Sequence, residues 1–148
     1  MLSARVAQMA KKKVKPINLD KAIAEVLEQY GQDVYEVLDD CVQEVSDEAV
    51  KKLRSVSTFA TGGHTEYSSS WVNDKMPSGR LKTKRVVHNE EHYRLTHLLE
   101  KGHVVKNGRS RVTGEAYGEA GAYPHIAPVN DWANQELPKL VERKIKSI

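Results

Sequence analysis

The segment His88-Asn89-Glu90-Glu91-His92 carries residue types that bind zinc. Its spacing matches the H-x-x-E-H pattern of inverted zinc-peptidase motifs, in which two histidines on one helical face share the ion and a glutamate acts as base. A third ligand would have to come from Glu115, Glu119 or His125, in or beside a glycine-rich segment. Because a strand is expected to end at this segment, we favour a solvated turn. A zinc hydrolase using His88, Glu91 and His92 stays as one alternative.

Two basic segments could instead contact phosphate. Residues 1–15 contain five bases and no acid, and residues 101–111 are also basic. Basic side chains of this kind bind nucleic acid through its phosphates. Neither segment has a recognition helix or interleaved aromatic residues, so base reading is not indicated. A nucleic-acid-binding module that uses the arm and the 101–111 loop is therefore a second alternative.

Composition excludes several classes of protein. The chain has 148 residues, 39% of them hydrophobic, and its single cysteine excludes an internal disulfide. No apolar run approaches the ~20 residues that cross a bilayer, so we expect no membrane contact. The sequence contains no Ser-His-Asp order and no phosphate-cradling glycine loop. Apart from the zinc pattern at 88–92, we therefore expect no catalytic, cofactor or metal site.

A long amphipathic helix must position much of the chain. From Leu19 to Val56, apolar residues recur every three or four positions, with acids on the other face. This period predicts one helix of about 38 residues and about 57 Å. Cys41 lies on its apolar stripe and is expected to be a small core residue. A helix this long exceeds the ~30 Å of a small domain, so part of the stripe should meet another subunit.

The remaining elements are shorter. Strands are expected at 65–73 and 81–88 around a turn at 74–80, followed by a helix at 90–101 that Gly102 stops. Residues 103–112 read as a strand, turn and strand around Asn107-Gly108, residues 124–128 as a rigid extended piece, and a last helix starts at Asn130 or Asp131. Trp71 and Trp132 should anchor the core. We predict a flexible basic arm at 1–16 and one α+β domain at 17–148, with the long N-terminal helix packed on a small antiparallel sheet and closed by a C-terminal helix.

The order of these features resembles the tail-component family of long-tailed bacteriophages, which are small neck or tail-completion proteins. The resemblance covers residues 18–148. Two motifs carry most of it: the Tyr…Leu-Leu-Glu-x-Gly-His stretch at 93–103 and the Pro-His-x-x-Pro piece before the last helix. The matching scaffold residues are Trp71, Leu98, Leu99, Gly102, Pro124, His125, Pro128 and Trp132. The basic arm before Pro16 is longer than the pattern requires.

This resemblance implies a structural, non-catalytic virion component at the head–tail junction. It implies a sixfold ring of identical subunits around the path of the DNA, in contact with other neck and tail proteins. The chain would be made in the host cytoplasm and end in the virion. Whether it touches DNA directly is left open by the sequence.

Charge is strongly segregated along the chain. Residues 16–50 hold ten acids against one base, whereas residues 75–111 hold ten bases against three acids. These regions can meet within a subunit or between neighbours, and opposite charges suit a head-to-tail contact that closes into a ring. The expected interface residues are Val34, Leu38 and Val45 for affinity, with Asp39, Asp40 and Glu44 facing Arg109 and Arg111.

Overall fold

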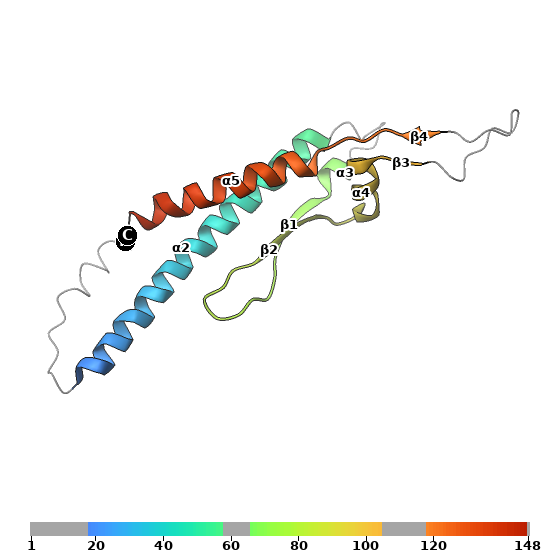
Figure 1. Cartoon of the computed structure of the whole chain (residues 1–148). Coiled ribbons are helices and arrows are strands. Elements are labelled where there is room, and N and C mark those ends of the chain that lie inside the picture. Colours follow the sequence, from blue (N-terminus) through green and yellow to red (C-terminus); the bar gives the residue numbers. More distant parts are fainter. Residues whose placement is uncertain (1–17, 58–65, 105–117, 148) are drawn as a thin grey trace, which may run out of the picture. The chain divides into compact units, whose positions relative to one another are not determined.

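The computed structural model describes residues 18–57, 66–104 and 118–147 (Figure 1). In chain order they form α2 (Leu19–Val56), α3 (Glu66–Ser69), β1 (Trp71–Lys75), β2 (Arg85–Asn89), α4 (Tyr93–Lys101), β3 (His103–Val104), β4 (Glu119–Ala120) and α5 (Ile126–Ile145). The chain is mixed α+β and mostly helical. The predicted class, with a long N-terminal helix, a small antiparallel sheet and a C-terminal helix, is confirmed.

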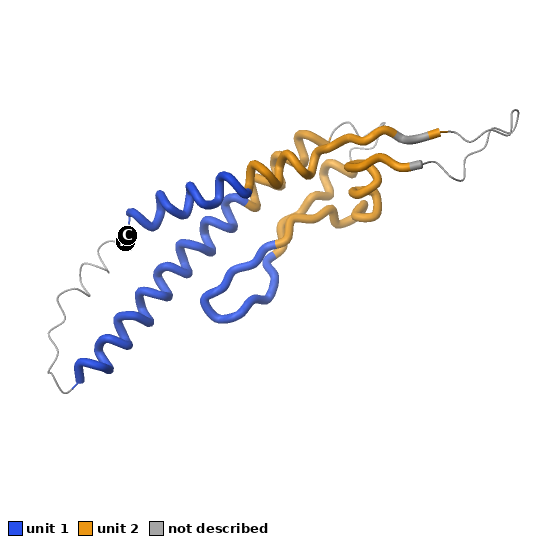
Figure 2. Tube along the Cα trace, viewed as in Figure 1, with its two compact units in different colours: residues 1–45, 75–85, 134–148 blue, residues 46–74, 86–133 orange. Residues whose placement is uncertain are grey.

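The chain divides into two compact units, each built from segments that are distant in the sequence (Figure 2). Unit 1 takes in residues 1–45, 75–85 and 134–148, and unit 2 takes in residues 46–74 and 86–133. Both α2 and α5 contribute residues to each unit. The buried residues of each unit are described separately below.

The interior of unit 1 is formed by one stripe of α2. Val37, Cys41 and Val45 follow one another at four-residue steps and are buried, as is Leu140 of α5. Cys41 is fully buried, which raises the pKa of its thiol. The helix has 38 residues, as its hydrophobic period predicts. Its role as a core element and that of Cys41 as a small core residue are both confirmed.

The interior of unit 2 gathers around Trp71. Its buried apolar residues are Ala49, Val50, Leu53, Tyr67, Trp71 and Val129. Leu99 and Trp132 pack against this cluster while partly exposed, and the Lys52 ammonium lies 4.5 Å from the centre of the Trp132 ring. Trp71, only 2% exposed, is the central anchor that the sequence predicts, and Trp132 is an anchor at the edge.

The strand predicted at 65–73 is wrong in its first half. Residues 66–69 form the helical turn α3, and β1 begins only at Trp71. The hydroxyls of Ser69 and Ser70 donate to the carbonyls of Glu66 and Tyr67 three residues earlier. Serines that bond back to the local backbone in this way compete with a strand ladder.

The second strand is also shorter than predicted, since β2 begins at Arg85. Leu81 has a positive φ of 57°, which interrupts extended backbone before β2. The strands β1 and β2 pair in a two-stranded sheet, and the loop between them closes with a hydrogen bond from Met76 N to Lys84 O at 2.9 Å. The predicted hairpin is therefore present with a longer connection.

Two predictions after β2 have different outcomes. The short helix is confirmed as α4, and Gly102 ends it with a φ of 72°, a value that favours glycine. His103–Val104 pairs antiparallel with Glu119–Ala120, so the partner of this strand lies beyond the predicted 103–112 hairpin. Asn107-Gly108 itself lies outside the described residues.

The last helix starts earlier than predicted. It begins at Ile126 rather than after Asn130, so the extended piece expected at 124–128 is wrong from Ile126 onward. Pro128 occupies the first turn of α5, where a helix needs no backbone N–H. In the parts of the chain that the structure describes, no helix is both long and apolar enough to cross a bilayer.

Candidate functional site

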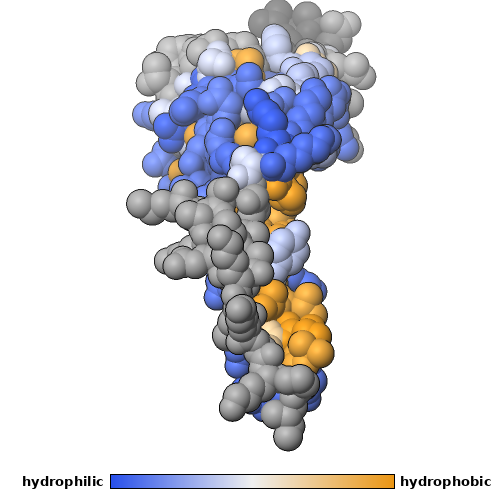
Figure 3. All heavy atoms as spheres, turned by 90° about the vertical axis from the view of Figure 1, so that its left-hand side faces the viewer, coloured by the Kyte–Doolittle hydropathy of each residue, from blue (hydrophilic) through white to orange (hydrophobic). Residues whose placement is uncertain are grey.

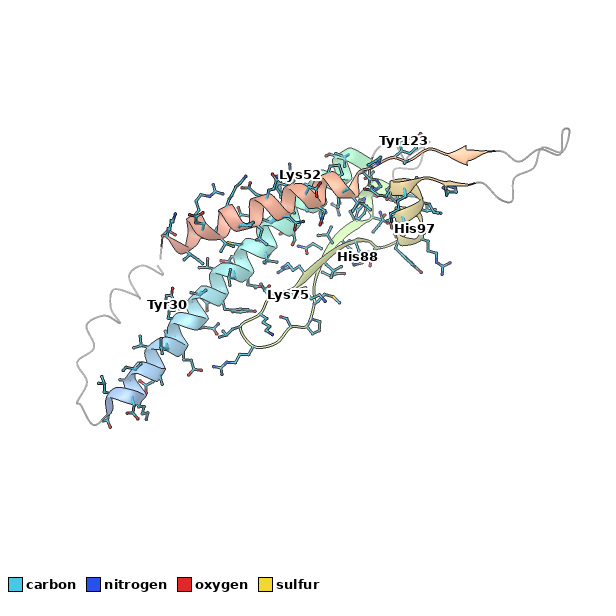
Figure 4. All side chains as sticks on the ribbon, viewed as in Figure 1. Tyr30, Lys52, Lys75, His88, His97 and Tyr123 are labelled. Atoms are coloured by element: carbon cyan, nitrogen blue, oxygen red, sulfur yellow. The ribbon has the colours of Figure 1, made fainter. Side chains whose placement is uncertain are left out.

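The residues of the H-x-x-E-H pattern do not share a helix. His88 lies in β2, and Glu91 and His92 lie in the turn before α4, while His97 belongs to α4 itself (Figure 4). His88 Nε2 is 2.7 Å from Asp74 Oδ2. An inverted zinc motif needs both histidines on one helical face, so this arrangement does not fit it. Within 18–57, 66–104 and 118–147, no three His, Cys, Asp or Glu residues are grouped to hold a metal ion.

The candidate third ligands do not complete a zinc site either. Glu115 lies outside the described residues, and Glu119 is in β4. His125 is 2% exposed, and both of its ring nitrogens have partners. Its Nδ1 is 2.7 Å from the carbonyl of Tyr123, which can only accept, so Nδ1 carries the proton. Nε2 then accepts a hydrogen bond from the Tyr67 hydroxyl at 2.8 Å when the ring is neutral.

Glu100 connects α4 to the start of α5 through its carboxylate. Oε2 accepts hydrogen bonds from the backbone nitrogens of His125 at 2.7 Å and Ile126 at 2.9 Å, and Oε1 accepts one from Ala127 at 2.8 Å. Burial by itself would raise the pKa of Glu100, but these three bonds and the nearby His125 ring outweigh it and lower the pKa. A carboxylate at this place satisfies N–H groups that have no partner within the helix. Glu100 is thus an N-terminal cap supplied from another helix.

Asn89, at the end of β2, also connects several elements through hydrogen bonds of its side chain. Its Nδ2 donates to the carbonyl of Tyr67 at 2.8 Å, and its Oδ1 accepts from Ser70 Oγ and from the backbone nitrogen of His92, each at 2.8 Å. Asn89 is only 1% exposed, so these bonds are made away from water. One amide side chain therefore fixes α3, the end of β2 and the turn before α4.

This polar cluster, made of Tyr67, Asn89, Glu100 and His125, has the chemistry of a scaffold. Burial, with the nearby charge of Glu100, raises the pKa of Tyr67 to about 12, so its hydroxyl stays protonated at neutral pH. The hydrogen bonds of the cluster satisfy backbone ends and tie elements together. We find here no nucleophile paired with a base that faces an open space. The cluster stabilises unit 2.

Sequence reasoning singled out His125 of this cluster and missed the other three residues. Asn89 had a usable signal, since Asn placed shortly before a helix often satisfies a free N–H there. Glu100 belongs to the Leu-Leu-Glu-x-Gly-His motif, but nothing in that motif indicates its partner, because Ile126 lies 26 residues further along the chain. Leu98 is half-buried, Leu99 packs against the core, and the flanking prolines of His125 are exposed.

In unit 1, the acidic face of α2 is paired with bases of the same chain. Asp39 Oδ2 is 2.8 Å from Lys75 Nζ, and Asp39 Oδ1 accepts from Thr83 Oγ1 at 2.6 Å. These two hydrogen bonds, from Lys75 first and then Thr83, lower the pKa of Asp39. Further ion pairs join Glu28 to Arg80 and Glu44 to Lys144, and Arg85 donates a hydrogen bond to the neutral Gln43. Of the two expected ways for acid and base to meet, the one within a subunit is therefore present.

The expected interface residues have different positions. Val34 and Leu38 are half-buried and Asp40 is exposed, but Val45 is only 6% exposed within its own unit. Val45 has no surface to offer a neighbour, and its place in the expected interface is corrected to the interior. Arg109 and Arg111 lie outside the described residues, as do the arm at 1–16 and most of the 101–111 loop.

The surface most suited to an assembly contact lies at the beginning of α2. We call Leu19, Ile23, Val26, Leu27 and Tyr30 the apolar face of α2. Their exposed fractions run from 38% to 64%, with Leu27 the highest. Figure 3 shows hydrophobic side chains gathered at the lower end of the view, and Tyr30 is labelled on α2 in Figure 4. Exposed apolar surface of this kind marks interaction sites.

Comparisons with known proteins add no relative. No protein-family model matches the chain, no curated protein matches it, and no solved structure matches it. Its function is therefore inferred from the arrangement of residues above and from the order of its sequence motifs.

Proposed function

We propose that the chain is a structural component of a long-tailed bacteriophage virion, placed at the head–tail junction. It acts without catalysis, as a ring of identical subunits around the path of the DNA. Its partners are copies of itself and other neck and tail proteins. It is made in the host cytoplasm and functions in the virion.

One observation carries most of this proposal. The two motifs behind the family resemblance are in direct contact, because Glu100 of the first binds His125, Ile126 and Ala127 of the second. Motif residues that form a helix cap and a core contact serve a scaffold, whereas an active site needs groups that face a substrate. This contact favours a structural protein over the zinc hydrolase.

The apolar face of α2 supports an assembly role. A ring needs a surface on each subunit that the free chain does not use in its own core. Leu19, Ile23, Leu27 and Tyr30 are about half exposed or more, and they are followed along the helix by the exposed Asp40. Apolar contact there would supply affinity, and charge would set register and encounter rate.

The test is made in particles. We expect deletion of the gene from the producing phage to leave separate filled heads and tails, and addition of purified protein to restore joined virions. Joined virions from the deletion strain would contradict the proposal. In the add-back, Leu27→Asp should fail because it places a charge on the apolar face, whereas Glu90→Asp, a conservative change at an exposed residue of unit 2, should join normally.

A further inference from the structure

The apolar face of α2 is exposed in the structure. Its five side chains follow steps of four, three, one and three residues, so they share one side of the helix. Each is at least 38% exposed to solvent. Five large apolar side chains in one stripe would favour association if they stayed in water.

The segment just before α2 matches this face in polarity. Leu2, Val6 and Met9 are spaced by four and three residues, the same steps that separate apolar residues on the face. Residues 1–15 and the apolar face of α2 therefore each carry a row of apolar residues at helical spacing. Contact between the two rows would remove apolar surface of both from water.

Charge complementarity points to the same occupant. Residues 1–15 hold five bases and no acid, whereas the first ten residues of α2 hold three acids against one base. The bases are Arg5, Lys11, Lys12, Lys13 and Lys15, and the acids are Asp20, Glu25 and Glu28, of which Glu28 is also paired with Arg80. A second copy of α2 would bring acids against acids, which disfavours it as the cover.

The length of residues 1–15 and their short connection to α2 also suit contact with the apolar face. From Leu19 to Tyr30 the helix rises about 17 Å at 1.5 Å per residue, and fifteen residues span this distance in any backbone conformation. Residues 16–18 leave three residues of chain between the segment and α2, which is within the usual length of connections between antiparallel neighbours. A tether this short gives a local concentration of the order of millimolar, well above that of other copies in dilute solution.

We propose that residues 1–15 of the same chain lie against the apolar face of α2 in the free protein, with Leu2, Val6 and Met9 on that face. A neighbour that uses the face in a ring must first displace this segment. The basic arm is then a cover that keeps the free chain from associating. The contact within one chain is independent of the virion function, and only its displacement in a ring rests on the proposed function.

The test places a photo-crosslinking amino acid at position 27 of the full chain. We expect illumination to join position 27 to a peptide from residues 1–15. An equal mixture of ¹⁴N- and ¹⁵N-labelled chains should give products of one isotope only, because the contact is within one chain. Mixed-isotope products, products with other segments, or no protein product would each overturn the proposal.

Two substitutions in the segment make the test specific. Val6→Asp places a charge in the apolar row and should lower the cross-link yield about tenfold, the effect of about 1.4 kcal/mol. Gln8→Asp adds the same charge outside that row and should leave the yield within about twofold of the original. Equal losses in the two variants would mean that only net charge matters and would contradict the apolar docking. Circular dichroism confirms that both variants keep their helix content.

Discussion

Glu100 and His125 meet at the first turn of α5. Oε2 of Glu100 accepts a hydrogen bond from the backbone nitrogen of His125 at 2.7 Å and lies 3.0 Å from its Nδ1. The end of α4 and the beginning of α5 are thereby fixed to one another inside unit 2. Since His125 also binds the Tyr67 hydroxyl, one chain of hydrogen bonds joins α4, α5 and α3.

Removing this cap should destabilise the protein. Glu100→Ala leaves the N–H groups of His125, Ile126 and Ala127 at the start of α5 without their acceptor, and we expect the free energy of unfolding to fall by about 2 kcal/mol. Urea unfolding followed by circular dichroism measures it. Glu90→Ala removes an exposed glutamate from the same unit and should change stability by no more than about 0.5 kcal/mol. Equal stability of the two variants would show that the cap contributes nothing.

The cap should also be sensitive to acid. The pKa of Glu100 in the folded chain is below its usual value of 4.5, so the unfolded chain takes up a proton first as pH falls. The stabilisation is complete above pH 4.5 and is lost as pH falls through the lower folded pKa. We therefore expect the stability difference between wild type and Glu100→Gln to be constant from about pH 7 to 5 and to shrink below. A difference that grows in acid would contradict this assignment.

The hydroxyl of Tyr67 gives a smaller, separate effect. Tyr67→Phe keeps the buried ring but removes the partner of His125 Nε2 at 2.8 Å. We expect a loss of about 1–2 kcal/mol, because a buried acceptor is left without that hydrogen bond. Tyr93→Phe, at an exposed tyrosine of α4, is the matched control and should be near neutral. Thermal unfolding of the two variants compares them directly.

The parts of the fold that the sequence predicts well depend on local period or on one residue. The stripe from Leu19 to Val56 gives α2 because every turn of a 38-residue helix repeats the same signal. Gly102 ends α4 because its positive φ suits glycine. Trp71 is the core anchor because a side chain of that size gains most from burial.

The parts that the sequence does not predict depend on partners far along the chain. The start of α5 is set by Glu100, so a search for a local cap places it four residues late, at Asn130. The hydroxyls of Ser69 and Ser70 bond back to the carbonyls of Glu66 and Tyr67, which favours the helical turn α3 over the expected strand. Val45 lies on the same stripe as exposed residues, and only the packing of unit 1 tells that it is buried.

Zinc binding tests the H-x-x-E-H segment. His88 is in a strand and paired with Asp74, so we expect purified protein dialysed against zinc and then washed to retain far less than one ion per chain. His88→Ala should leave the retained zinc unchanged. One ion per chain that disappears in His88→Ala would favour the zinc hydrolase over the structural role. Elemental analysis by mass spectrometry provides the measurement.

The final prediction separates acids that serve the fold from an acid available to a neighbour. Asp39 is bound by Lys75 and Thr83 of its own chain, whereas Asp40 is exposed on the next position of α2. Asp39→Lys should therefore weaken unit 1 itself. Asp40→Lys should keep the unfolding transition of the wild type but lower the yield of joined virions in the add-back assay.

If the expected partners of Asp40 are Arg109 and Arg111 of a neighbour, reversing both to Glu in the Asp40→Lys chain should restore part of the joining. The restoration depends on opposite charges meeting again, so the same two reversals in the wild-type chain should impair joining. Glu90→Lys changes the net charge as much as Asp40→Lys does, but it lies on unit 2, and it should have no effect on the yield of joined virions. Normal joining by Asp40→Lys would remove this acid from the ring contact and leave the apolar face of α2 as its main element.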